Sequence, residues 1–124
     1  MTEITLVRHG QASFGSENYD QLSELGIQQS RWLGAYFANR NISFDRVIVG
    51  SQQRHQQTAQ ESIGPLNNMP DIEIHPGFNE YEFHILFNNF CEQYPEQTST
   101  AYDGRRHFYA VLRKALVAWS KNQL

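Results

Sequence analysis

Short apolar runs alternate with longer stretches of helical periodicity along this chain, and this alternation is the feature that most constrains its fold. The runs predict strands at residues 4–7, 44–49 and 71–75. The periodic stretches predict helices at residues 23–39, 54–62, 83–90 and 108–119. Strands that alternate with helices favour a mainly parallel sheet covered on both faces. We therefore predict an α/β fold, a three-layer sandwich formed by one domain over residues 1–124.

The order of the elements also predicts that this domain is incomplete at its C-terminus. The last helical stretch runs almost to Leu124, where the alternation calls for another strand. A truncated sheet exposes a strand edge and an apolar helix face, and both favour association. The sequence therefore predicts a truncated domain that is prone to form a homodimer.

The charge balance and the single cysteine exclude several classes of protein. Ten Lys and Arg against thirteen Asp and Glu give a net charge of −3, without the basic excess that binds nucleic acid or anionic membranes. Cys91 is the lone cysteine, which excludes an internal disulfide and a multi-cysteine zinc site. The apolar runs are too short for a signal peptide or a membrane span. We expect a cytoplasmic protein with no nucleic-acid or membrane partner.

Reactive side chains follow the predicted strands directly. Ligands of an open α/β sheet bind beyond the carboxyl ends of the strands. Arg8 and His9 follow the first predicted strand, Arg54 follows the second, and Glu80 follows the third. A neutral imidazole attacks phosphorus, guanidinium groups bind phosphate oxygens, and a carboxylic acid protonates a leaving oxygen. This combination predicts phosphoryl transfer.

Four ordered motifs within residues 4–82 resemble those of the histidine phosphatase superfamily, which includes the phosphoglycerate mutases. The motifs are Arg8-His9-Gly10-Gln11-Ala12, the Leu-Ser-x-x-Gly-x-x-Gln segment at 22–29, the Arg-x-x-x-Thr-Ala segment at 54–59, and Phe78-Asn79-Glu80. The resemblance implies a phosphoglycerate mutase-like fold and a small phosphorylated substrate.

The resemblance also implies a role for each matching residue. His9 matches the nucleophile that forms a phosphohistidine, and Glu80 matches the acid that protonates the leaving group, with Glu82 as an alternative. Arg8 and Arg54 match the arginines that bind phosphate. The positions of further phosphate donors correspond to Gly10, Gln11, Ser13 and Gly15. Since arginines supply the positive charge, no metal and no other cofactor is expected.

Two departures from the family pattern stand out. Gly50 occupies a position where relatives commonly have Ser or Thr. The second active-site histidine of the family, on a later strand, has no counterpart among His55, His75, His84 and His107. We interpret His55 as a surface residue, or as one that supports the site from outside it.

Three activities are compatible with these motifs. We favour hydrolysis of the phosphate monoester of a small metabolite, through a phosphohistidine intermediate. Isomerisation of the phosphoglycerate mutase type is the first alternative, but the chain has no insert that would order a diphosphorylated effector. The second alternative is a fragment that binds a phosphorylated ligand without turnover.

Overall fold

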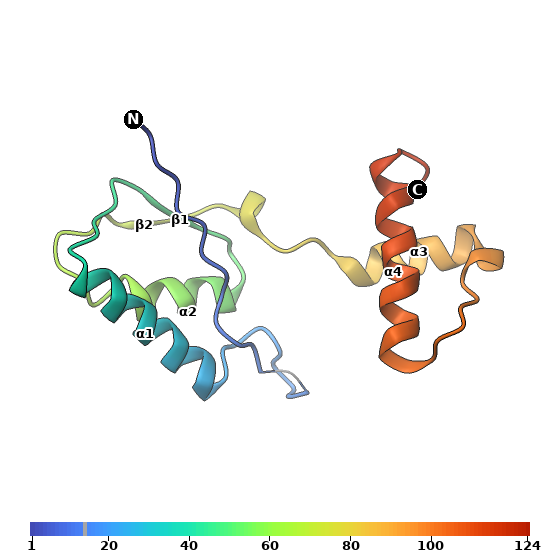
Figure 1. Cartoon of the computed structure of the whole chain (residues 1–124), viewed down its shortest axis with the longest axis horizontal. Helices are drawn as coiled ribbons and strands as arrows, with labels where there is room; N and C mark the ends of the chain where they lie inside the picture. Colours follow the sequence, from blue (N-terminus) through green and yellow to red (C-terminus); the bar gives the residue numbers. More distant parts are fainter. Residues whose placement is uncertain (14) are drawn as a thin grey trace. The chain divides into compact units, whose positions relative to one another are not determined.

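The computed structural model describes residues 1–13 and 15–124, and it separates into two compact units, residues 1–80 and 81–124. The N-terminal unit contains α1 (Glu24–Asn39), β1 (Val47–Val49), α2 (Gln53–Ser62), β2 (Ile72–Ile74) and the 3-10 turn η1 (Pro76–Phe78) (Figure 1). The C-terminal unit contains α3 (Phe83–Gln93), the 3-10 turn η2 (Pro95–Gln97) and α4 (Gly104–Ser120). The described residues therefore form an α/β fold.

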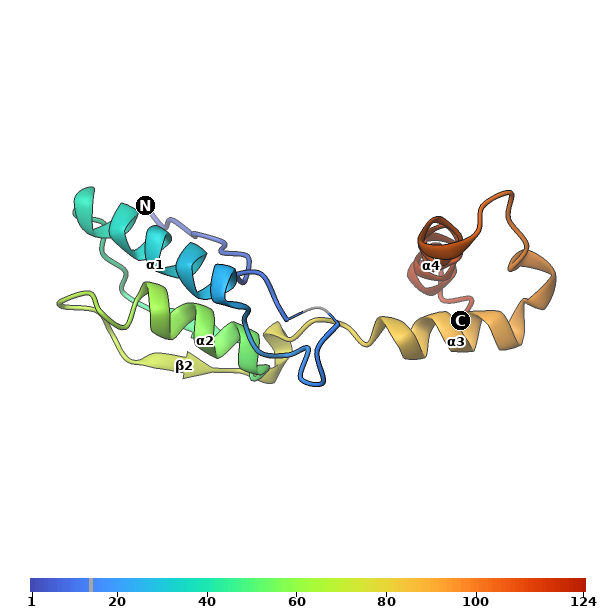
Figure 2. The same cartoon turned by 90° about the horizontal axis from the view of Figure 1, so that it is seen from below.

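The two strands are parallel, with Val47 opposite Ile72 and Val49 opposite Ile74. The His75 amide continues the ladder by donating to the Val49 carbonyl at 2.8 Å. Both helices of this unit lie on the same side of the strands, and α2 lies nearer to them than α1 (Figure 2). Because the strands run in the same direction, the segments that follow them begin at the same edge of the sheet.

Small side chains bring α1 and α2 into close contact. Gly26, Ser30 and Gly34 are buried and lie four residues apart, so they share one face of α1. A Cβ atom on Gly34 would lie 2.5 Å from the carbonyl oxygen of Ser62 in α2. A side chain of any size at position 34 would therefore push the two helices apart.

The prediction of a buried strand at residues 4–7 is wrong for this structure. These residues have no regular secondary structure, and the side chains of Ile4 and Leu6 are 79% and 91% exposed. Among the described residues, no backbone hydrogen bond joins residues 1–8 to β1 or β2. An apolar β-branched run forms a strand only where a neighbouring strand pairs with it and its side chains are covered. The strands predicted at 44–49 and 71–75 are confirmed, in shorter form.

The C-terminal unit is a pair of packed helices. Phe90, Val111 and Ala115 are buried at its centre, and the Phe87 and Phe108 rings stack with centroids 4.8 Å apart. The helices predicted at 83–90 and 108–119 are thus confirmed, whereas Trp119 of α4 is 55% exposed. No helix in the described ranges is long and apolar enough to cross a membrane.

The contact at Gly34 makes a prediction about stability. Gly34→Ala should lower the free energy of unfolding by about 1–2 kcal/mol, because overpacking outweighs the higher helix propensity of alanine. Urea denaturation followed by circular dichroism measures this change. Gln28→Ala, an exposed position on the same helix, should stay within about 0.5 kcal/mol of the wild type. Undiminished stability of the Gly34→Ala protein would contradict the close packing.

Candidate active site

His9 lies at the end of the N-terminal segment with its ring half-buried. Its Nδ1 atom is 2.6 Å from the carbonyl oxygen of Gly10. Because a carbonyl oxygen only accepts, this contact requires the proton on Nδ1. The neutral ring then keeps its lone pair on Nε2.

The loop after His9 is held by hydrogen bonds from its own backbone. The Gly10 amide donates to Thr58 Oγ1 at 3.0 Å, the Gln11 amide to Gln29 Oε1 at 2.9 Å, and the Ser13 amide to the Gln21 carbonyl at 2.8 Å. These three backbone N–H groups are therefore engaged within the protein.

Two further groups expected to bind phosphate, Gly15 and the side chain of Gln11, belong to exposed residues. Gly15 is exposed and has a φ of +83°, a left-handed conformation that favours glycine. The side-chain oxygen of Gln11 accepts from the Ser23 hydroxyl at 2.8 Å, which directs it toward the start of α1. A phosphate contact by Gly10, Gln11, Ser13 or Gly15 stays a prediction.

Thr58 connects the loop of His9 to the helix of Arg54. The Thr58 hydroxyl donates to the carbonyl of Arg54 at 2.7 Å and accepts from the Gly10 amide. The residue is 5% exposed. Loss of this hydroxyl would leave the Gly10 N–H buried without a partner, which typically costs about 1–3 kcal/mol.

Arg54 is only 6% exposed, and neighbours on two sides hold its guanidinium. Nη1 donates to Asp20 Oδ1 at 2.8 Å and Nη2 donates to Gln52 Oε1 at 3.1 Å. Nε is buried and has no hydrogen-bond partner among the described residues. The side chain is thus fixed in place by Asp20 and Gln52, while its buried Nε–H has no partner within the described part of the chain.

Asp20 places a carboxylate at the N-terminus of α2. Its Oδ2 accepts from the Gln53 amide at 2.7 Å, and its Oδ1 accepts from the Arg54 amide at 3.3 Å. Burial alone would raise the pKa of Asp20, but these amides and the Arg54 guanidinium outweigh it and hold the pKa below the ordinary value of 3.8. Asp20 therefore caps the helix and orients Arg54 while ionised.

Gln52 brings Glu80 close to Arg54. Besides Arg54 Nη2, Gln52 Oε1 accepts from the Glu80 amide at 3.0 Å. The side chain of Asn79 holds the same segment: its Oδ1 accepts from the Ser51 amide at 2.6 Å and its Nδ2 donates to the Ser51 hydroxyl at 2.8 Å. The segments after β1 and β2 are thus joined by side-chain amides.

Glu80 and Glu82, the two candidate acids, lie in different surroundings. Glu80 is exposed and is the last residue of the N-terminal unit. Glu82 is the N-cap residue of α3 and belongs to the C-terminal unit. The hydrogen bond from the Glu80 amide to Gln52 and the bonds between Asn79 and Ser51 hold the segment that carries Glu80.

His55 lies beside His9, with ring centroids 5.6 Å apart. Burial lowers the pKa of His55, and the charges of Arg54 and His9 lower it further, while Asp20 and Glu80 act in the opposite direction. The structure thus places the half-buried His55 next to His9, and its role as a surface or supporting residue stays a prediction.

Arg8 is exposed, and no hydrogen bond or ion pair links its guanidinium to another described residue. The structure therefore brings together His9, Arg54 and Glu80, through Thr58 and Gln52. The contribution of Arg8 to phosphate binding stays a prediction.

Comparison with known proteins bears on what this arrangement does. The family model for the histidine phosphatase superfamily (branch 1) matches residues 4–111. This chain belongs to that superfamily. The match confirms the resemblance and extends beyond the segment that carries the four motifs. Among curated proteins, none matches the chain.

Two solved structures are similar to this superfamily member. One is the protein histidine phosphatase SixA complexed with tungstate, at 20% identity and a TM-score of 0.50, covering 71% of this chain and 58% of that one. The other is a proposed alpha-ribazole-5'-P phosphatase from Escherichia coli, at 20% identity and a TM-score of 0.45, covering 94% of this chain and 60% of that one. The chain spans about three fifths of the length of each. The likeness to SixA supports the fold.

Sequence reasoning missed three residues of this candidate site. Asp20 lies in the polar loop before α1, and its role depends on α2 reaching it from 33 residues further along the chain. Thr58 and Asn79 stand inside the recognised motifs, but only their contacts show what they do. One local signal was available: Thr58 follows Arg54 by four residues, the spacing at which a threonine hydroxyl on a helix can donate to the earlier carbonyl.

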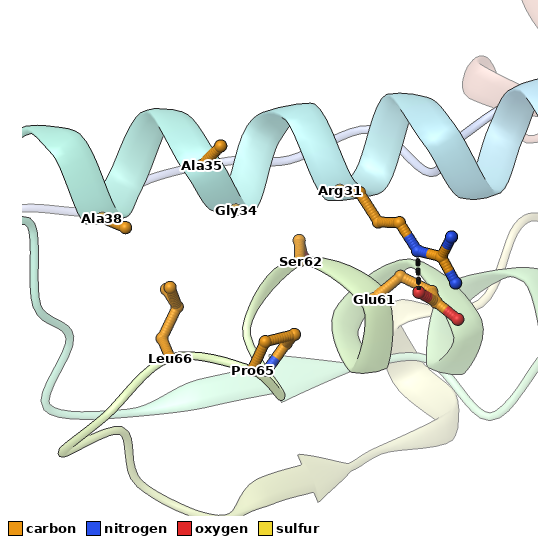
Figure 3. A pocket seen from close by; sticks show the side chains of 8 residues that line it. All are labelled: Arg31, Gly34, Ala35, Ala38, Glu61, Ser62, Pro65 and Leu66. Atoms are coloured by element: carbon orange, nitrogen blue, oxygen red, sulfur yellow. Dashed lines mark hydrogen bonds and ion pairs between the residues drawn. The ribbon is translucent and has the colours of Figure 1, made fainter.

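Two cavities of the N-terminal unit differ in their distance from the candidate site residues along the fold: one is lined by Asp20 and the other is not. An apolar cavity of 340 Å³ lies between α1 and the end of α2, with the Arg31–Glu61 ion pair beside it (Figure 3). It contains no candidate site residue. A polar cavity of 400 Å³ lies against Asp20, and its other lining residues are Ser51, Gln53, Gln56, Gln57 and Gln60.

The position of Asp20 predicts a pH dependence of stability. Because its folded pKa is lowered, its contribution is complete well above 3.8 and disappears as the pH falls through the folded pKa. Asp20→Asn should be less stable than the wild type by about 1 kcal/mol near neutral pH, since the charge at the helix terminus is lost. The two proteins should converge in acid.

Urea denaturation from roughly pH 7 down to pH 3 follows this convergence. Asp71→Asn removes an exposed carboxylate and should change the free energy of unfolding by less than about 0.5 kcal/mol near neutral pH. An Asp20→Asn deficit that stays constant into acid would rule out the ionised cap.

Proposed function

We propose that this member of the histidine phosphatase superfamily hydrolyses the phosphate monoester of a small metabolite through a phosphohistidine at His9. The observation that carries the proposal is the hydrogen bond from His9 Nδ1 to the Gly10 carbonyl, since it leaves Nε2 free to attack phosphorus. Membership of the superfamily and the contacts that join His9 to Arg54 and Glu80 support it.

In the first step, His9 Nε2 attacks phosphorus in line with the ester oxygen. The N–P bond forms as the P–O bond breaks, and Arg8 and Arg54 stabilise the charge on the equatorial oxygens. Glu80 gives its proton to the departing alcohol. The fixed guanidinium of Arg54 needs little reorganisation to do this.

In the second step, water attacks the phosphorus of the phosphohistidine. The N–P bond breaks, its electron pair returns to Nε2, and the water proton passes to the Glu80 carboxylate. Inorganic phosphate leaves, and His9 and Glu80 regain their starting protonation states. An alcohol in place of water would make the same chemistry a mutase reaction.

The proposal also covers the fold around the site, the cavity for the substrate, the location of the enzyme and its oligomeric state. The fold is a three-layer sandwich, and its phosphate site includes Gly10, Gln11, Ser13 and Gly15. The family match runs through both units, which supports a single domain. The amide-lined cavity beside Asp20 suits the polar alcohol portion of a metabolite. We propose a cytoplasmic enzyme that forms a homodimer.

The proposal predicts the effect of removing the nucleophile. His9→Ala should lower kcat for hydrolysis of an aryl phosphate by about a thousandfold or more, because the covalent route is lost. Arg54→Met should lower it by about a hundredfold. Steady-state kinetics measure both effects, and rapid acid quenching with labelled substrate should trap phosphate on the wild-type protein alone.

Other outcomes of these assays would favour one of the two alternative functions, a mutase or a phosphate-binding fragment. Isomerisation of a phosphoglycerate that is faster than hydrolysis would identify a mutase. Inorganic phosphate that raises the midpoint of thermal unfolding, with no turnover and no labelled protein, would identify a phosphate-binding fragment.

The proposal also predicts which carboxylate is the proton donor. Glu80→Gln should reduce the hydrolysis of alkyl phosphates by about a hundredfold or more, because a poor leaving group needs the proton. Hydrolysis of an aryl phosphate with an acidic phenol should fall much less. Glu82→Gln is the matched control and should leave both rates near the wild type. A reversed pattern would assign the acid to Glu82.

A further inference from the structure

The space beside the nucleophile is filled by a second imidazole. His55 stands in the first turn of α2, and its ring lies 5.6 Å from the ring of His9, between centroids, at an angle of 36°. A glycine makes this position accessible, because a Cβ atom on Gly50 would collide with Nδ1 of His55. The departure from the family pattern at position 50 thus leaves room for the ring at position 55.

The His55 ring has no hydrogen-bonding function within the described part of the chain. No side-chain hydrogen bond or ion pair connects either ring nitrogen to another described residue. The residue is only half-buried, so a ligand can reach it. By contrast, His75 Nδ1 accepts from the Gly77 amide and His107 Nδ1 is bonded to Thr100.

We propose that His55 is a catalytic residue whose ring N–H donates a hydrogen bond to an equatorial oxygen of the phosphoryl group as it is bound and transferred to His9. The proposal rests on the proposed function, since it takes His9 as the nucleophile. The side-by-side arrangement of the two rings favours a contact with the equatorial oxygens, because the leaving and entering oxygens lie on the axis through Nε2.

The electrostatic surroundings agree with a neutral donor. Burial lowers the pKa of His55 first, and the charges of Arg54 and His9 lower it further, whereas Asp20 and Glu80 partly offset them. A neutral ring always carries one N–H group and one lone pair. His55 therefore adds a directed donor next to His9 without placing a second full charge beside Arg54.

Oxyanion binding by the whole chain tests this contact without relying on turnover. The probes are inorganic phosphate and tungstate, titrated calorimetrically into the wild type, His55→Phe, His55→Gln and the control His84→Phe, an exposed position on α3. His55→Phe keeps an aromatic ring but no donor, and we expect its Kd to rise about tenfold. His55→Gln retains an N–H donor and should recover part of the affinity, and His84→Phe should match the wild type.

Histidine ring resonances give a second readout that a packing role would not change. In a phosphate titration of the wild type followed by ¹⁵N NMR, the ring signals of His9 and His55 should shift with one midpoint. A His55→Phe protein that is folded by circular dichroism and binds phosphate within twofold of the wild type would overturn the inference. So would a titration that shifts His9 and leaves His55 unmoved.

The two proposals fail in different ways. If phosphate shifts the ring of His9 and labelled phosphate is trapped there, but His55 does not respond, only the role of His55 is lost. If the wild type binds neither probe and no phosphate is trapped on His9, the proposed function fails, and the role of His55 fails with it.

Discussion

A continuous series of hydrogen bonds through Thr58 and Gln52 determines the geometry of the whole candidate site. Thr58 joins the Gly10 amide to the Arg54 carbonyl, and Gln52 joins the Arg54 guanidinium to the Glu80 amide. The proposed nucleophile His9, the proposed phosphate-binding residue Arg54 and the proposed acid Glu80 come from three segments that are far apart in sequence. These neutral polar groups align the three segments before any substrate is present, which is the condition for electrostatic catalysis.

Helix α1 supports the loop after His9 and contributes no reacting group to the candidate site. Gly26 lies so close to the loop that a Cβ atom on it would collide with the carbonyl oxygen of Gln11, and Gln29 binds the Gln11 amide. Ser23 both caps α1 and donates to the Gln11 carbonyl at 3.2 Å. The recognised segment at 22–29 is therefore the support on which the loop after His9 rests.

Local signals predicted some parts of this molecule well. The helices and the two paired strands follow from hydrophobic periodicity, and the short motifs place Arg54 and Glu80 after the two paired strands. The apolar run at 4–7 shows the limit of such signals, because strand formation depends on a partner that no local pattern specifies. Asp20 and His55 show a second limit. Their roles arise from contacts with residues remote in sequence or in another element, and neither stands at a motif position that names a function.

The contact between Gly50 and His55 has an evolutionary consequence. The two positions compete for one volume, so a side chain at position 50 and a ring in its present place at position 55 exclude each other sterically. Substitutions at these sites should therefore be epistatic: a larger residue at 50 requires the ring at 55 to be lost or to move, and it also requires Asn79 to shift, because a Cβ atom there would lie 2.6 Å from Asn79 Oδ1. Among homologous sequences, the pair should covary.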